Sequence, residues 1–124
     1  MKIKHWTDVP AEPVPGLDGV TTRWVLAEQD DAPHFALRVI EVQPGLATPY
    51  HTHWWEHEVF ILNGKGSLVM PESETPLSPG MTILVEGNET HQFRNAGDEV
   101  LRFICLIPHE WLEGLAEKHA SQTL

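Results

Sequence analysis

The sequence has little of three features that mark common classes of protein: cysteine, positive charge and long hydrophobic runs. It holds one cysteine, Cys105, in 124 residues, which excludes an internal disulfide and predicts a cytoplasmic location. Lys and Arg number 8 against 18 Asp and Glu, a formal net charge of -10, so we expect no nucleic-acid partner. No apolar run approaches the roughly 20 residues that span a bilayer, and we expect no membrane association.

Proline and glycine interrupt the chain at short intervals, which favours short strands over long helices. Ten prolines and nine glycines occur in 124 residues, and most lie between segments rich in β-branched and aromatic side chains. No segment repeats another, and the length suits one domain. We therefore expect an all-β sandwich or closed barrel, with strands in residues 21–26, 34–42, 58–62, 66–70, 82–85 and 100–107.

The two ends of the chain differ from this central part. Residues 1–20 contain three prolines and are expected to form an extended N-terminal arm, followed by a barrel over residues 21–108. Residues 109–124 place apolar side chains at helical spacing and predict a short C-terminal helix, although Gly114 weakens a helix interior and leaves a frayed tail as the alternative. The arm also carries Val9, Val14, Leu17 and Val20. Burial of these side chains on a second copy predicts a homodimer.

Three histidines lie within seven residues of one another. His51 and His53 are separated by one residue, which places both rings on one side of a strand, and His57 has the same parity. Three imidazoles in one space would leave buried nitrogens without partners, at about 1–3 kcal/mol each. A divalent metal removes this cost by accepting a lone pair from each ring. Glu58 has the opposite parity and should point away.

Two motifs match the pattern of a known family. The first runs glycine, five residues, His-x-His, three residues, a third ligand, six residues and glycine, as in Gly45, His51, His53, His57 and Gly64. The second contains Gly80, His91 and Asn95 at the expected intervals, with Glu86 and Asn88 in place of a proline and a glycine. Asparagine tolerates positive φ, so the turn is retained. On these residues the chain resembles the cupins, and in particular their small four-histidine members.

The resemblance implies a jelly-roll barrel with one divalent metal held by His51, His53, His57 and His91. Manganese or iron is the ion that it favours, while ligand softness favours iron, nickel, copper or zinc. Glu58 remains as an alternative ligand to His57 by a looser spacing. In a six-coordinate ion, four protein ligands leave two positions open for a small-molecule ligand or for substrate with dioxygen.

The function suggested by these features is that of a dioxygenase-like oxidoreductase, dependent on oxygen or peroxide. Two alternatives stay open: a non-catalytic module that binds or senses a small ligand, and a metal-dependent isomerase. The fold supports all three, because function resides in the site and not in the barrel. An isomerase needs a general base, and the sequence places none clearly.

Five residues are expected to line the substrate pocket: Arg38, Trp55, Phe103, Cys105 and Ile107. Arg38 and Cys105 are also the candidates for a catalytic role. Arg38 could hold a substrate carboxylate, or it could be a solvated arginine on an edge strand. Cys105 could be reactive, or it could be inert packing among apolar neighbours. The other histidines, His5, His34, His109 and His119, are expected at the surface.

Overall fold

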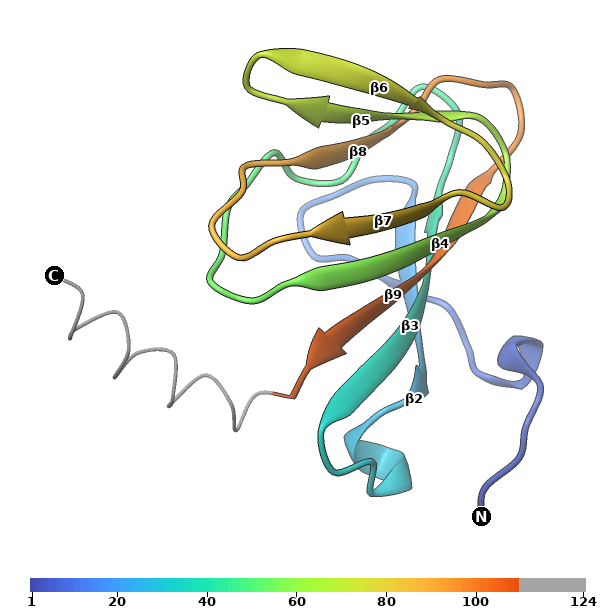
Figure 1. Ribbon diagram of the computed structural model, residues 1–124. Coiled ribbons are helices and arrows are strands. Elements are labelled where there is room, and N and C mark those ends of the chain that lie inside the picture. Colours follow the sequence, from blue (N-terminus) through green and yellow to red (C-terminus); the bar gives the residue numbers. More distant parts are fainter. Residues whose placement is uncertain (110–124) are drawn as a thin grey trace, which may run out of the picture.

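The computed structural model describes residues 1–109, which form two antiparallel sheets wrapped into a jelly-roll barrel (Figure 1). The larger sheet has the strand order β1-β2-β3-β9-β4-β7, and the smaller has the order β6-β5-β8. The strands are β1 (Glu12–Pro13), β2 (Val20–Leu26), β3 (Phe35–Val42), β4 (His57–Asn63), β5 (Gly66–Met70), β6 (Ser73–Leu77), β7 (Thr82–Val85), β8 (Gln92–Asn95) and β9 (Leu101–Pro108). Two 3₁₀ turns, η1 (Trp6–Asp8) and η2 (Glu28–Asp30), flank β2.

The predicted strands follow from the alternation of side chains along the sequence. In β4 and β9 every second residue is buried, because one face of each strand meets the barrel interior. The core between the two sheets is formed by the apolar side chains Val20, Ile40, Val42, Val59, Ile61, Leu68, Leu77, Val85, Phe93, Leu101, Phe103 and Cys105. The all-β architecture is therefore confirmed. No described helix has the length and hydropathy required to span a membrane.

Three strands were not expected, namely β6, β8 and the two-residue β1 in the arm. β6 contains Pro76 and exposed polar side chains, so it lacks the apolar pattern of a core strand. It lies at the edge of the smaller sheet, where a proline is tolerated because its missing N–H would face away from the ladder. β8 follows His91 directly and pairs with β5, although its four residues are too few to show a period.

The N-terminal arm packs on its own barrel over part of its length. β1 pairs with β2, and the Val14 N–H donates to the Val20 carbonyl over 3.0 Å. Val14 and Leu17 lie against the core cluster. Residues 110–124, to which the expected C-terminal helix belongs, lie outside the described residues.

The expectation for His109 is wrong. Its side chain is 5% exposed, whereas His5 and His34 are exposed as expected and His119 lies outside the described residues. The cause is that β9 stays paired with β3 as far as Pro108, and the His109 N–H then donates to the His34 carbonyl over 3.1 Å. This pairing holds His109 against the sheet.

Candidate metal centre

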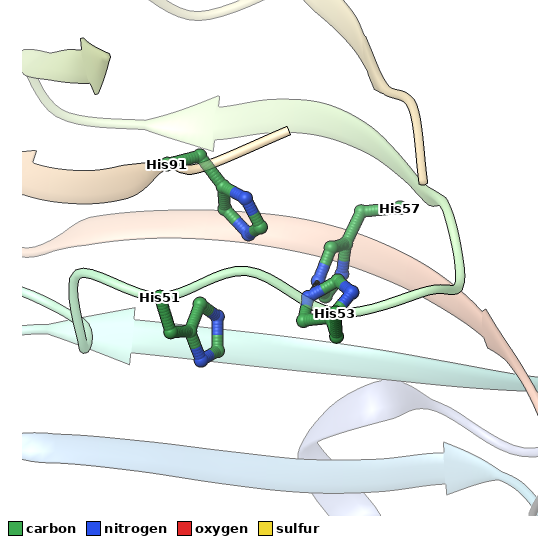
Figure 2. A group of neighbouring side chains, drawn as sticks. All are labelled: His51, His53, His57 and His91. Carbon is green, nitrogen blue, oxygen red and sulfur yellow. Dashed lines mark hydrogen bonds between the residues drawn. The ribbon is translucent and has the colours of Figure 1, made fainter. Parts of the chain in front are cut away.

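Four imidazoles converge at one end of the barrel, and one nitrogen of each lies within 4.8 Å of the others. Figure 2 shows His51 and His53 on one loop, His57 where β4 begins, and His91 on the segment that leads into β8. His51 and His91 lie directly opposite each other and exchange two backbone hydrogen bonds of 3.1 and 3.0 Å. The fold thus joins the two motifs, which are far apart in the sequence.

The convergence of His51 and His53 has a different cause from the strand alternation expected. His51 forms only an isolated bridge, and His53 lies in a loop. The His53 ring is held instead by Trp55, whose indole stacks on it with the ring centroids 4.1 Å apart and the planes at 5°. The direction of this ring therefore depends on a local aromatic contact.

The turn of the second motif also holds this loop. Asn88 has φ +69°, and its N–H donates to the His53 carbonyl over 2.7 Å. Gly87 lies so close to the Trp54 carbonyl that a Cβ atom there would overlap its oxygen. The positive φ expected of Asn88 is confirmed, and the turn fixes the loop next to His91.

Backbone carbonyls orient two of the four rings. His53 Nδ1 donates to the Trp55 carbonyl over 2.8 Å, and His91 Nδ1 donates to the Glu89 carbonyl over 2.7 Å. The proton on Nδ1 leaves the Nε2 lone pair free to bind a metal. His53 Nε2 lies 2.6 Å from His57 Nε2, a contact that requires a proton or a cation between the two lone pairs.

Burial is the main reason why three of the rings, those of His51, His53 and His57, stay neutral. Burial, with the charges of neighbouring imidazoles and of Arg38, lowers the pKa of His57 from 6.5 to about 2. The pKa of His53 falls to about 4 for the same reasons, although its bond to the Trp55 carbonyl opposes the change. Burial also lowers the pKa of His51. Neutral rings at physiological pH can donate their lone pairs to a metal.

His57 differs from the other rings on its outer side. Its Nδ1 lies 2.8 Å from Cys105 Sγ and 3.5 Å from Arg38 Nη2. Arg38 Nη2 also donates to Cys105 Sγ over 3.1 Å. Burial raises the pKa of the Cys105 thiol, against the opposing effect of Arg38. When His57 Nε2 serves as a ligand, Nδ1 carries the ring proton and donates a hydrogen bond to the Cys105 sulfur.

Beside the histidines lies a largely apolar cavity of about 310 Å³. His51, His57 and His91 form part of its wall. The remainder comes from the arm, from both sheets and from the loop before His51: Glu12, Pro13, Val14, Pro15, Val20, Thr22, Trp24, Arg38, Ile40, Thr48, Pro49, Phe93, Phe103 and Cys105. A cavity of this size suits a small, partly aromatic molecule.

The structure brings three of the five expected pocket residues to this cavity. Arg38, Phe103 and Cys105 line it. Trp55 and Ile107 line two other hollows and not this cavity. Glu58, the alternative ligand, is exposed on the outer face of β4 and does not belong to the histidine group.

Sequence reasoning missed several residues of the cavity wall. Phe93 could have been found, because it lies two residues after His91 and therefore on the same side of the chain. Trp24 lies opposite Arg38 in the β2–β3 pair, and a register between distant strands is not readable from one sequence. The arm residue Val14 carried no signal for a place at the cavity.

The residues present fit a divalent transition metal. All four donors are imidazoles, two of them have their outer nitrogens bonded to carbonyls, and two inner lone pairs face each other. Imidazole ligands suit iron, nickel, copper and zinc. Such an ion would neutralise the repulsion between the inner lone pairs, which no described side chain does.

Comparison with known proteins supports the same conclusion about the fold. The family model "Cupin domain" matches residues 38–107, more than half of the chain. The structure is similar to that of the polyketide cyclase RemF from Streptomyces resistomycificus, with a TM-score of 0.82 and 38% sequence identity. The similarity covers 87% of this chain and 79% of that one.

Two further relatives have different functions. The chain is 34% identical over 74 residues to 1-methylthio-D-xylulose 5-phosphate methylsulfurylase of Rhodospirillum rubrum, which covers 60% of this chain and 47% of the relative. It is 33% identical over 73 residues to Auxin-binding protein 1 of Arabidopsis thaliana, covering 52% and 37% respectively. The chain thus spans about half or less of the length of these two relatives, which include an enzyme and a binding protein.

Proposed function

The chain belongs to the cupin domain family, and on this premise we propose that it is a metal-dependent enzyme which activates a small enolisable carbonyl compound. The observation that carries the proposal is the position of the histidine group. Three of its four imidazoles, those of His51, His57 and His91, lie in the wall of a largely apolar cavity of about 310 Å³, and the fourth, His53, contacts His57. Apolar walls exclude water and strengthen electrostatic interactions between the site and a bound molecule.

His51, His53, His57 and His91 would hold the metal, with no carboxylate ligand. Iron is the ion that both the ligand type and the family resemblance favour. A divalent ion, when bound, polarises a carbonyl oxygen and makes the neighbouring carbon more acidic. The imidazoles remain neutral and leave the full charge of the ion available for this effect.

The other cavity residues select and orient the substrate. Phe93 and Phe103 stack with their centroids 4.7 Å apart and form an aromatic wall next to His91. Thr22 and Thr48 supply hydroxyl groups to the lining. Val14 closes the cavity from the arm. These contacts favour a flat, mainly apolar molecule with few polar groups.

The reaction class proposed is ring closure of a polycarbonyl compound, in which an enol carbon bonds to a carbonyl carbon of the same molecule and water leaves. The similarity to a polyketide cyclase over 87% of the chain supports this class. A β-dicarbonyl compound needs only a weak base for enolisation, so the lack of an obvious base among the described cavity residues is compatible with it.

An oxygen-dependent oxidoreductase is the second candidate. The all-imidazole donor set and a cavity on one side of the cluster leave room for substrate and dioxygen together. A third candidate, a binding module, is supported by the similarity to a protein named for auxin binding. Each candidate predicts a different fate for the same substrate.

One experiment separates the three. The protein is loaded anaerobically with Fe²⁺ and incubated with linear triketones and phenolic enols, with and without ¹⁸O₂, and products are identified by mass spectrometry. Ring closure loses water in both atmospheres, whereas an oxygenase gives ¹⁸O-labelled product only with oxygen. If every compound binds but is recovered unchanged under every condition, both enzyme proposals are contradicted. The His57→Gln variant serves as the metal-poor control.

We also propose a cytoplasmic homodimer, with the subunits joined through the outer face of the larger sheet. The N-terminal arm packs on its own barrel, which makes it less suited to packing on a second copy of the chain. The outer face of β4 and β7 instead exposes Phe60, Leu62 and Leu84, and Glu58 is the one Asp, Glu, Lys or Arg residue of these two strands. For a chain of charge -10, this face offers the approach with the least repulsion. Phe60→Lys should give monomers in sedimentation, and a dimeric variant would contradict this interface.

A further inference from the structure

Arg38 places a guanidinium group in the cavity beside the proposed metal site. The side chain points inward from β3, on the same face as Ile40, and both line the cavity. Its Nη2 atom donates to Cys105 Sγ over 3.1 Å, and its Cζ lies 5.4 Å from the centre of the Trp24 ring. Its Nε atom is buried and has no hydrogen-bond partner in the part of the chain that the structure describes.

None of these contacts neutralises the charge of Arg38. A thiol, an indole face and an imidazole carry no negative charge when they are in their usual protonation states. Glu12 is the one carboxylate among the described cavity residues; it is exposed on β1 and forms no ion pair with Arg38. A guanidinium in a largely apolar cavity requires a counterion, because burial of an unpaired charge is costly.

The metal adds to this requirement. Four neutral imidazoles leave a divalent ion with its two positive charges, and Arg38 contributes a third on the same cavity. Arg38 lines the same cavity as His51, His57 and His91, so a molecule that fills this cavity can contact both the metal and the guanidinium. A ligand with negative charge at two neighbouring oxygens would match both groups.

We propose that Arg38 binds the carboxylate of the substrate while the metal side receives an adjacent enol or carbonyl oxygen, so that the substrate is a small enolisable carboxylic acid. The planar guanidinium fork matches a carboxylate, and the unpartnered Nε–H supplies a donor that is already fixed by Trp24 and Cys105. The enol half of this assignment rests on the proposed function, whereas the carboxylate half rests on Arg38 alone.

The test compares two probes of nearly the same shape. Salicylate has a carboxylate next to a hydroxyl group, and salicylamide replaces the carboxylate with a neutral amide. Binding of each to the Zn²⁺-loaded and the metal-free protein is measured by calorimetry. Wild type should prefer salicylate by at least tenfold in both forms. Arg38→Met should lose this preference in the metal-free form and reduce it about tenfold in the Zn²⁺ form.

Two variants control for indirect effects. Arg38→Lys keeps the charge without the fork and should retain part of the preference. Arg94→Met removes an exposed arginine paired with Glu74 and should change nothing. Melting temperature and bound zinc are measured for every variant. If the Arg38→Met protein does not fold, the Arg38→Lys variant takes its place. Its preference for salicylate over salicylamide must then be smaller than that of wild type.

Three results would overturn the assignment. The first is an unchanged salicylate preference in Arg38→Met. The second is no preference in metal-free wild type. The third is an Arg38→Met variant whose only defect is weaker zinc binding, which would make Arg38 a positioning residue for His57. A protein that shows the preference but no turnover with any metal would refute the proposed enzyme and leave the role of Arg38 intact.

Discussion

Two charged side chains three residues apart on β3 illustrate how the two faces of one strand differ. On the outer face, Glu41 is 8% exposed and accepts hydrogen bonds from Arg23 at 2.9 Å and Arg102 at 3.0 Å. The Trp6 ring covers both guanidinium groups, at 5.1 and 5.0 Å. On the inner face, Arg38 has no carboxylate partner among the described residues.

The difference shows which charges complete the fold and which are left for a ligand. Burial alone would raise the pKa of Glu41, but the bonds from Arg23 and Arg102 outweigh it and hold that pKa below its usual value. The carboxylate therefore remains charged and fully bonded. Arg38 remains charged and incompletely bonded, which lowers stability slightly but prepares the cavity for an anion.

The largest effect is expected where the outer network is broken. Glu41→Gln keeps the shape of the side chain and leaves two half-buried guanidinium groups without a counterion. We expect the free energy of unfolding in urea to fall by about 3 kcal/mol. The exposed pair between Glu74 and Arg94 provides the control, because Glu74→Gln should cost less than about 0.5 kcal/mol. Equal losses at the two sites would refute the distinction between the networks.

The same inside–outside contrast exists between neighbouring residues of β4. His57 is buried and faces the histidine group, whereas Glu58 is exposed on the outer face. His57→Gln should weaken zinc binding by at least about 100-fold, since even loss of a residue that only orients a ligand costs about 10–100-fold. Glu58→Gln should leave the affinity unchanged in a chelator competition assay. Loss of zinc in the Glu58 variant would show that Glu58, and not His57, is the third protein ligand.

The inner face can be given a counterion of its own. Cys105→Asp places a carboxylate within reach of Arg38 Nη2 and of His57 Nδ1, the two groups that contact the present sulfur. Carboxylates commonly orient metal-binding histidines, so zinc should be retained. Salicylate binding should fall by about tenfold because Arg38 is neutralised, which corresponds to about 1.4 kcal/mol. Cys105→Ser is the control, and equal salicylate affinity in the two variants would contradict the argument.

A smaller effect is expected from pH on the metal-free protein. The pKa of His57 is about 2 in the folded chain and 6.5 ordinarily, so the unfolded chain binds the extra proton below pH 6.5. The free energy of unfolding should therefore decrease as the pH falls. His57 should contribute about 1 kcal/mol to this decrease for each pH unit below 6.5. Urea unfolding at pH 7.5, 6.5 and 5.5 measures the slope, and His57→Gln should reduce it. A slope that does not change in the variant would show that other groups cause it.

The smallest effect on stability is expected at Arg38. Arg38→Met removes no ion pair among the described residues and replaces an incompletely bonded charge with an apolar chain. The free energy of unfolding of the metal-free protein should change by less than about 0.5 kcal/mol, or rise. Urea unfolding beside Glu41→Gln gives the direct comparison. A loss as large as that of Glu41→Gln would make Arg38 a structural residue.

Local patterns in the sequence were sufficient for most of the barrel. Alternation of apolar residues and the turns between them predicted six of the nine strands, because burial on one face of a strand imposes a period of two. β6 was not predicted because an edge strand buries few side chains, and because Pro76 is typical of the end of a strand. His109 was misplaced because its burial depends on the pairing of β9 with β3.

By itself the sequence indicated the class of fold through its strand alternation and turns. It indicated the residues of the metal group through the match of His51, His53, His57 and His91 to the two motifs of the family that it resembles. Only the tertiary structure decided which side chains share the cavity. Trp24, Val14 and Thr48 reach it from three distant segments, and Trp55 and Ile107 lie elsewhere. Only the structure, too, decided that Arg38 faces inward with no counterion within residues 1–109, while Glu41 faces outward between two arginines. The physical reason is that charge pairing and cavity shape depend on the register between strands, which is fixed by the packing of the whole barrel.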